Sequence, residues 1–289
     1  MSRLGFIYML TSGLAFALMS LLVGMVHQLQ PSLSVAMTSL IRALVNLALL
    51  LAFHWRAPLA LFGDRRPALW LRGLSGSGAL ITYFAALSRV GIGEASFLNQ
   101  TSTVWVAALA PWVLQEATSR RTWIAIGGAM MGMLLLSIPR TGVADDSVGR
   151  FLGVFSGFLA AIAYLSIRRA GASNGPSVIV FYFTLVSAAL CLVMLSFEPV
   201  IWPEHWQVWA VLVGVGVMAT LGQLYMTRAY KIGPASAVAA MAYASPLLTA
   251  ILGVAFLDQL PDTAGWIGMA LILLCGVALP ALQALPRAG

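Results

Sequence analysis

The stretch "AALSRVGIGEASFLNQTSTVWVAALAPWVLQEATSRRTW", residues 85–123, decides the fold because it holds one complete apolar segment between two polar ends. The polar residues gather at 89–94 and 116–121, and the residues between the two clusters are mostly apolar. A helix needs about 20 predominantly apolar residues to cross the hydrocarbon core of a bilayer. The stretch therefore predicts a transmembrane helix over residues 94–114.

The whole chain repeats this pattern. Of its 289 residues, 61% are hydrophobic and only 9% are charged, whereas soluble domains carry about 25% charged residues. Apolar runs follow one another with short breaks, which predicts an all-α polytopic membrane protein. We expect its first span to be retained, because that run is too long for the apolar region of a signal peptide. Ten spans are predicted, at residues 4–26, 33–53, 68–88, 94–114, 121–138, 151–170, 177–197, 207–229, 235–257 and 264–284.

The basic residues predict the orientation. An even number of spans leaves both termini on one side of the membrane, and cytoplasmic loops are enriched in Lys and Arg. If that side is the cytoplasm, the outer loops carry only Arg89, Arg140 and Arg150. We therefore expect a protein of a bacterial-type inner membrane with both termini in the cytoplasm. The net charge of +7 then results from the basic residues of the cytoplasmic loops, and we expect no nucleic-acid partner. The expected cytoplasmic residues are Arg3, Arg56, Arg65, Arg66, Arg72, Arg120, Arg121, Arg168, Arg169, Arg228, Lys231 and Arg287.

A shift of the sequence by 143 residues aligns the two halves. The aligned pairs are Ala86 with Ala229, Thr103 with Pro246, Glu116 with Gln259, and Trp123 with Trp266. Together with five predicted spans on each side of the loop at 139–149, this predicts two repeats, residues 1–141 and 148–286. An odd number of spans per repeat inverts the second copy. Inverted repeats are the architecture of many secondary transporters, which bind substrate between the halves.

Polar residues form one stripe on the predicted helix 94–114. Ser96, Asn99 or Gln100, and Thr103 recur at helical spacing on one face. Polar side chains on one face of a helix are not expected to face lipid, and two interpretations of their role stay open. The residues can form hydrogen bonds to neighbouring helices, or they can line a polar substrate cavity.

Four features of the sequence resemble the drug/metabolite transporter superfamily in its EamA-like branch. They are Arg42 in the second span, "AALSRVGIGEAS" (85–96), "RAYKIGPASAV" (228–238) and "YASPLLTAILGVAFLDQ" (243–259). The chain departs from the family at Thr103, where proline is frequent, and at Asp258 and Gln259, where glutamate is frequent. The resemblance covers nearly the whole chain, and it implies ten spans as two inverted five-helix repeats around a central cavity.

The resemblance also implies which residues bind substrate, because the first, third, fourth, sixth, eighth and ninth spans line the cavity in this superfamily. Transferred by helix and face, it implies a set of polar and aromatic residues. The set is Phe16, Ser20, Tyr83, Asn99, Thr103, Trp105, Tyr164, Gln223 and Tyr243.

Two further residues are candidates from their own chemistry. Pro246 removes a backbone N–H from the ninth span, which can kink the helix for packing or free a carbonyl for a substrate. Arg42, some nine residues into the second span, is the one clear base predicted to lie within the hydrocarbon core. An intramembrane charge can act as a gate or contact a substrate carboxylate, although a long side chain can also reach the interface or neighbouring carbonyls.

The function expected from these features is export of small amphiphilic metabolites by alternating access, first of all amino acids, including aromatic ones. Drugs or nucleoside-like solutes would suit the same cavity, and an intramembrane enzyme or a receptor is a remote alternative. The three histidines lie near span ends, and we expect no enzyme activity, no cofactor and no metal. Proton antiport, exchange and downhill export all stay open, as does the oligomeric state, with a monomer among the options.

Overall fold

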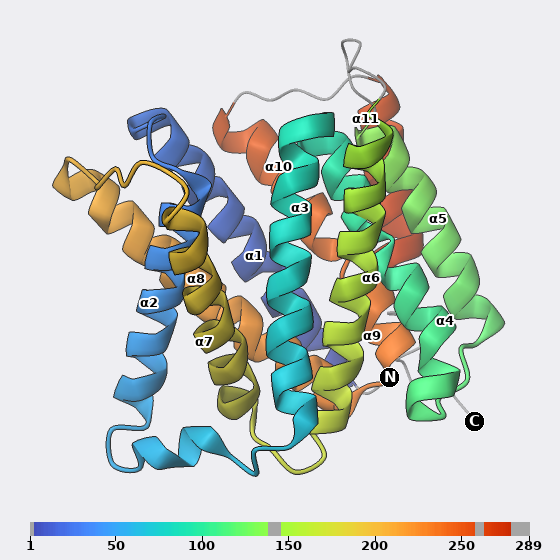
Figure 1. Cartoon of the computed structure of the whole chain (residues 1–289). Helices are drawn as coiled ribbons and strands as arrows, with labels where there is room; N and C mark the ends of the chain where they lie inside the picture. Colours follow the sequence, from blue (N-terminus) through green and yellow to red (C-terminus); the bar gives the residue numbers. More distant parts are fainter. Residues whose placement is uncertain (1–2, 138–145, 258–262, 279–289) are drawn as a thin grey trace.

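The computed structural model describes residues 3–137, 146–257 and 263–278, and every regular element in these ranges is a helix. This confirms the all-α class predicted from the sequence. Figure 1 shows the helices side by side as a bundle. The helices are α1 (Arg3–Leu29), α2 (Val35–Phe53), the 3₁₀ helix η1 (Pro58–Phe62), α3 (Pro67–Gln100), α4 (Ser102–Leu114), α5 (Arg120–Ser137), α6 (Ser147–Ala170), α7 (Pro176–Leu195), α8 (Trp206–Ile232), α9 (Ala235–Met241), α10 (Ala244–Leu257), α11 (Thr263–Leu271) and the π-helix η2 (Ile272–Ala278).

Six helical stretches of the described chain are long and apolar enough to cross a membrane. They are α1, α2, α6, α7, α8 and the stretch Ala235–Phe256, which joins α9 to α10. A helix of 20 residues is about 30 Å long, which matches the hydrocarbon core. The chain is therefore an integral membrane protein. The other predicted spans fall on α3, α4, α5 and α11, which are shorter or contain charged residues, and the last one extends beyond the described residues.

Large apolar side chains cover the outside of the bundle. Trp112 is 85% exposed, Phe197 84% and Phe53 71%. Side chains of this size would be costly in water, whereas lipid solvates them without loss. The outer surface therefore agrees with a protein whose solvent is a bilayer.

One sharp bend divides α3. The hydroxyl of Tyr83 lies 2.9 Å from Oγ of Ser96, thirteen residues further along the same helix. In a straight helix the two Cα atoms would be about 20 Å apart, so α3 must fold back between them. Figure 1 shows the α3 ribbon turning over at the upper end of the molecule before it continues toward α4. The predicted boundary between the spans 68–88 and 94–114 falls in this bend.

The helices are also interrupted at two other places in the chain. α3 ends at Gln100 and α4 begins at Ser102, and α9 ends at Met241 just before α10 begins at Ala244. Pro246, which has no N–H, lies in the first turn of α10. The carbonyl of Ala242 accepts from the N–H of Ser245 at 3.1 Å instead. The helix is thus interrupted just before Pro246, and a local hydrogen bond satisfies the carbonyl that the proline leaves free.

Helices from the first and second halves of the chain pack directly on each other. α1 packs against α8 and α10, and α3 packs against α6 and α7. α1 and α8 approach closely at Gly222, because a Cβ there would lie 2.7 Å from the ring of Phe16. Oγ of Ser12 donates to the carbonyl of Gly222 at 2.8 Å across the same contact. Small residues allow this proximity in membrane helices.

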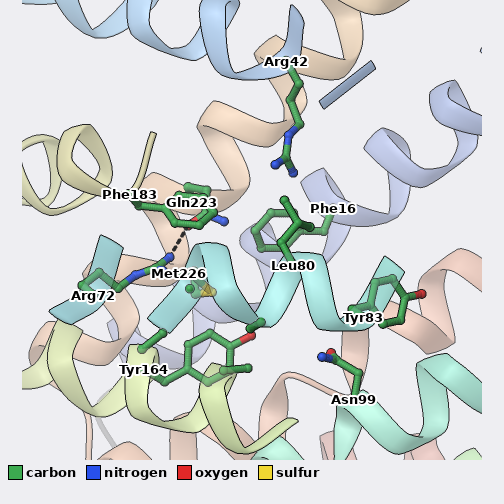
Figure 2. Close-up of a pocket in the computed structure, with 14 residues that line it drawn as sticks. Phe16, Arg42, Arg72, Leu80, Tyr83, Asn99, Tyr164, Phe183, Gln223 and Met226 are labelled. Carbon is green, nitrogen blue, oxygen red and sulfur yellow. Dashed lines mark hydrogen bonds between the residues drawn. The ribbon is translucent and has the colours of Figure 1, made fainter. Parts of the chain in front are cut away.

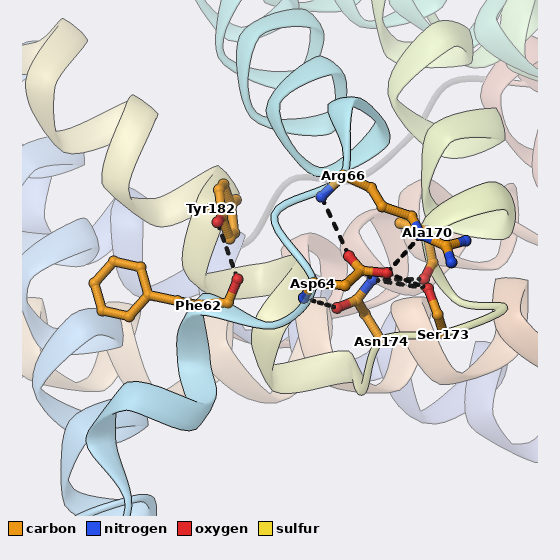
Figure 3. Close-up of polar contacts among 7 residues, drawn as sticks. All are labelled: Phe62, Asp64, Arg66, Ala170, Ser173, Asn174 and Tyr182. Atoms are coloured by element: carbon orange, nitrogen blue, oxygen red, sulfur yellow. Dashed lines mark hydrogen bonds and ion pairs between the residues drawn. The ribbon is translucent and has the colours of Figure 1, made fainter.

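A polar cluster ties the connection after η1 to the connection between α6 and α7 (Figure 3). The carboxylate of Asp64 accepts from Oγ of Ser173 at 2.6 Å and from Nδ2 of Asn174 at 2.8 Å. These hydrogen bonds, together with those to Arg66, hold the pKa of Asp64 below its usual value. Nearby, the hydroxyl of Tyr182 on α7 donates to the carbonyl of Phe62 at 3.0 Å. Two loops far apart in sequence are thereby joined.

Candidate functional site

A cavity of about 210 Å³ lies among the helices, and both halves of the chain form its wall. The N-terminal half, α1 to α5, contributes residues of α1, α2 and α3. The C-terminal half, α6 to η2, contributes residues of α6, α7 and α8. Figure 2 shows the side chains around it. The 14 lining residues are Phe16, Arg42, Arg72, Gly76, Ala79, Leu80, Tyr83, Asn99, Ala160, Ala163, Tyr164, Phe183, Gln223 and Met226.

The structure brings six of the candidate residues together in this lining. They come from five different helices, so their meeting depends on the fold and not on local sequence. They are Phe16, Arg42, Tyr83, Asn99, Tyr164 and Gln223.

Five other candidates do not line this cavity. Oγ of Ser20 donates to the carbonyl of Phe16, one turn earlier on α1, at 3.0 Å. The ring of Trp105 packs edge-on against Phe158 with centroids 5.4 Å apart. These side chains take part in helix packing.

The remaining three, Thr103, Tyr243 and Pro246, lie near the two helix breaks. Oγ1 of Thr103 donates to the carbonyl of Ala239 at 3.4 Å, and the side chain is 2% exposed. Tyr243 is fully buried, and its hydroxyl donates to the carbonyl of Gln100 at 3.4 Å. This region is a buried contact between the α3–α4 junction and the segment from α9 to α10.

The polar residues 96–103 have different surroundings in the structure. Asn99 lines the cavity, and its Nδ2 also donates to Oγ of Ser156 on α6 at 2.9 Å. Ser96 bonds to Tyr83, another lining residue. The helix is interrupted at Thr101, between α3 and α4, so these residues do not share one continuous face and Thr103 contacts α9 instead.

Arg72 is a lining residue that the sequence did not assign to the site. The basic-residue count put it at the cytoplasmic end of a span, whereas its side chain is 3% exposed and faces the cavity. Its Nη2 donates to Oε1 of Gln223 at 3.0 Å, and its Cζ lies 4.2 Å from the ring centre of Phe183. Gly76, one turn further along α3, makes room, since a Cβ there would overlap the guanidinium. The sequence signal that could have indicated this position of Arg72 is a glycine four residues later on the same helix.

The charged residues of the cavity lining are both basic. Arg42 reaches the same cavity from α2, and it is half-buried. Among the 14 lining residues none is acidic. Neither Arg42 nor Arg72 forms an ion pair with a carboxylate among the residues that the structure describes. The cavity therefore contains two cationic groups together with amide, hydroxyl and aromatic side chains.

A second polar cluster joins the ends of four helices, α4, α6, α8 and α9, outside the cavity. Glu116, just after α4, accepts from Nε of Arg168 on α6 at 2.8 Å. Its other oxygen accepts from the backbone N–H of Ala235, the first residue of α9, at 2.8 Å. Arg168 also donates to the carbonyl of Lys231 at the end of α8. One carboxylate thus connects the two halves of the chain at this end of the bundle.

Comparisons with known proteins agree with this architecture. The model of the EamA-like transporter family matches twice, over residues 3–138 and 147–279. The chain is 28% identical to the pseudopaline exporter CntI of Pseudomonas aeruginosa, covering 94% of this chain and 96% of that protein. It is 27% identical to a riboflavin transporter of Vibrio cholerae, covering 93% and 90%. A solved crystal structure with 20% identity superposes with a TM-score of 0.85 over 98% of both chains, which shows a shared fold. The chain belongs to the EamA-like transporter family.

Proposed function

We propose that this chain is a secondary transporter that exports a small amphiphilic metabolite through the cavity of Figure 2. The observation that carries the proposal is that helices of both halves form the cavity wall. A movement of one half against the other would then open the cavity to each side of the membrane in turn. The names of two relatives that match more than nine-tenths of the chain, an exporter and a transporter, support this function.

The proposal includes ten spans, arranged as two inverted five-helix repeats over residues 1–141 and 148–286. Two separate matches to one family model support the duplication. The helix breaks support it as well, because α4 begins at Ser102 and α10 begins at Ala244, 142 residues later. The distribution of basic residues supports cytoplasmic termini in a bacterial-type inner membrane.

The cluster around Glu116 supports an alternating-access mechanism. Its two hydrogen bonds, to Arg168 and to Ala235, link α4 to helices of the other half. Rocking of the halves would have to break such a link at one end of the bundle while the other end closes. We infer that Glu116 and Arg168 act as a gate.

Amino acids are the proposed substrate class. Aromatic rings of Phe16, Tyr83, Tyr164 and Phe183 would contact the apolar part of a solute, and Asn99 and Gln223 would solvate its polar groups. Lipophilic drugs and nucleoside-like solutes would use the same rings. Transport by this route requires one copy of the chain, no cofactor and no enzyme activity.

Flux of radiolabelled solutes into and out of proteoliposomes tests the proposal. A panel of amino acids, nucleosides and lipophilic cations separates the substrate classes, and protein-free vesicles give the background. Asn99→Leu and Gln223→Leu should reduce flux at least about tenfold, because each removes a polar group from the cavity. Failure of every solute to move under any gradient would reject a transporter, and normal flux in both variants would reject this cavity as its route.

A further inference from the structure

The two arginines of the cavity are unusual for their position inside a membrane protein. A charged side chain within a span is costly, and it normally pairs with a group of opposite charge. Arg42 and Arg72 line one cavity that contains no acidic side chain in its described wall. Their charges are therefore left for a bound anion to neutralise.

The guanidinium of Arg72 is held in one position by its neighbours. The ring of Phe183 lies under the guanidinium, Gln223 accepts from Nη2, and Gly76 provides the space. The side chain is 97% buried, yet its Nε has no hydrogen-bond partner among the described residues. A guanidinium has five N–H donors in a planar fork that matches a carboxylate. Its fixed orientation and its unpaired donor point to an oxygen-rich ligand.

Arg42 reaches the cavity from α2, and it lies close to Phe183 and Gln223, which also contact Arg72. Figure 2 shows its side chain reaching from α2 toward the space beside Gln223, where the Arg72 guanidinium also points. Two guanidinium groups in the wall of one cavity suit a solute with two anionic groups. The rings of Tyr83 and Tyr164 lie further along the wall. Such rings can pack on an aliphatic segment and attract an ammonium group through their faces.

We propose that the cavity binds a small dicarboxylate, in particular an amino acid with a second carboxylate, through Arg42 and Arg72. This inference rests on the proposed transport function, and it narrows the substrate class from amino acids in general to doubly carboxylated ones. One carboxylate binds each guanidinium, and the ammonium group faces the aromatic wall.

Binding of radiolabelled L-glutamate to the purified full-length chain tests the inference, with L-glutamine as a competitor of nearly equal size and without the second carboxylate. The wild type should bind glutamate at least about tenfold more tightly than glutamine, since a charge-assisted hydrogen bond is stronger than a neutral one. Glutarate should compete, because it keeps both carboxylates.

Variants identify the groups responsible. Arg72→Gln and Arg42→Gln should each remove the preference for glutamate, and Arg72→Lys should keep part of it because the charge remains. Arg228→Gln is the matched control, since Arg228 lies over the rings of Tyr8 and Tyr225, outside the cavity lining. Thermal unfolding of each variant checks that the protein is folded.

The outcomes separate this inference from the transport function. Equal binding of glutamate and glutamine, absence of binding by both dicarboxylates, or a preference that survives in folded Arg72→Gln overturns the dicarboxylate site. If neutral amino acids cross proteoliposomes while glutamate does not bind, the chain is a transporter with a different substrate. If glutamate binds through Arg72 but nothing crosses, the anion site stands and the transport function fails.

Discussion

The hydroxyl of Tyr243 donates to the backbone carbonyl of Gln100, and these two residues are 143 positions apart, the same interval that aligns the two halves of the sequence. In a protein with two copies of one unit related by a twofold axis, equivalent positions touch each other only close to that axis. Under the proposed inverted repeats, the contact would mark the region about which the halves move.

Tyr243 should stabilise this region through its ring more than through its hydroxyl. The hydrogen bond is long at 3.4 Å, while the side chain is fully buried. We expect Tyr243→Phe to lower stability by less than about 1 kcal/mol and Tyr243→Ala to lower it by about 3–5 kcal/mol. Unfolding by denaturant in detergent micelles measures both. Equal losses in the two variants would contradict the packing role of the ring.

Gly76 should control the position of Arg72. A Cβ at this site would overlap the Arg72 guanidinium and press on the ring of Phe183, so Gly76→Ala should displace the flexible arginine without unfolding α3. Loss of one such contact, about 1 kcal/mol, corresponds to a roughly fivefold loss of glutamate affinity. Equilibrium binding measures it.

Gly127→Ala is the matched control for this substitution. Gly127 also lies within a helix, and a Cβ there would meet nothing within 4 Å. This variant should bind glutamate as the wild type does. An equal loss of affinity in both variants would mean that the effect comes from helix flexibility and not from Arg72.

Glu116→Gln should weaken the gate. In the carboxylate each oxygen accepts one of the two hydrogen bonds, from Arg168 and from Ala235; glutamine replaces one of these oxygens by an NH₂ group, which cannot accept. We expect the bundle to open more often at this end, which a cysteine in the cavity, Leu80→Cys, would report through faster reaction with a membrane-impermeant thiol reagent. Glu198→Gln, at an exposed position after α7, should leave the rate unchanged. An unchanged rate in Glu116→Gln would argue against the gate.

Asp64 should make stability depend on pH in acid. Hydrogen bonds from Ser173 and Asn174 lower the pKa of Asp64 in the folded protein below its ordinary value of 3.8. A lowered folded pKa means that the stabilisation is complete above the unfolded pKa and is lost as pH falls through the folded pKa. Asp64→Asn should thus be less stable than the wild type at pH 7, and the difference should shrink below about pH 4. Melting temperatures of both proteins across this range measure it, and a constant difference would contradict the assignment.

The sequence predicts the helices well because the bilayer imposes a length and a polarity that composition reveals directly. The run that ends at Ala170 is an example: the predicted span 151–170 and α6 share their C-terminal end, although α6 begins four residues earlier at Ser147. The meeting of Phe16, Asn99 and Gln223 needed the family resemblance, since no local pattern relates α1, α3 and α8.

The sequence predicts less well which individual side chains face the cavity. Arg72 lies only six residues into α3, where a basic residue ordinarily reaches the interface, and only the space above Gly76 turns it inward. Thr103 was assigned to the same face as Ser96 by helical periodicity, but that periodicity is interrupted at Thr101. Periodicity gives the face of a continuous helix, and it fails across a break.

The central claim is that solute crosses the membrane through the cavity that both halves form. Leu80→Cys puts a thiol in that cavity, and Leu74→Cys puts one on the same helix at a position that is 60% exposed on the outside. The measurement is solute flux in proteoliposomes before and after reaction with a bulky thiol reagent. We predict that the reagent blocks flux through Leu80→Cys and leaves flux through Leu74→Cys and the wild type unchanged. Full flux through completely labelled Leu80→Cys would contradict the account.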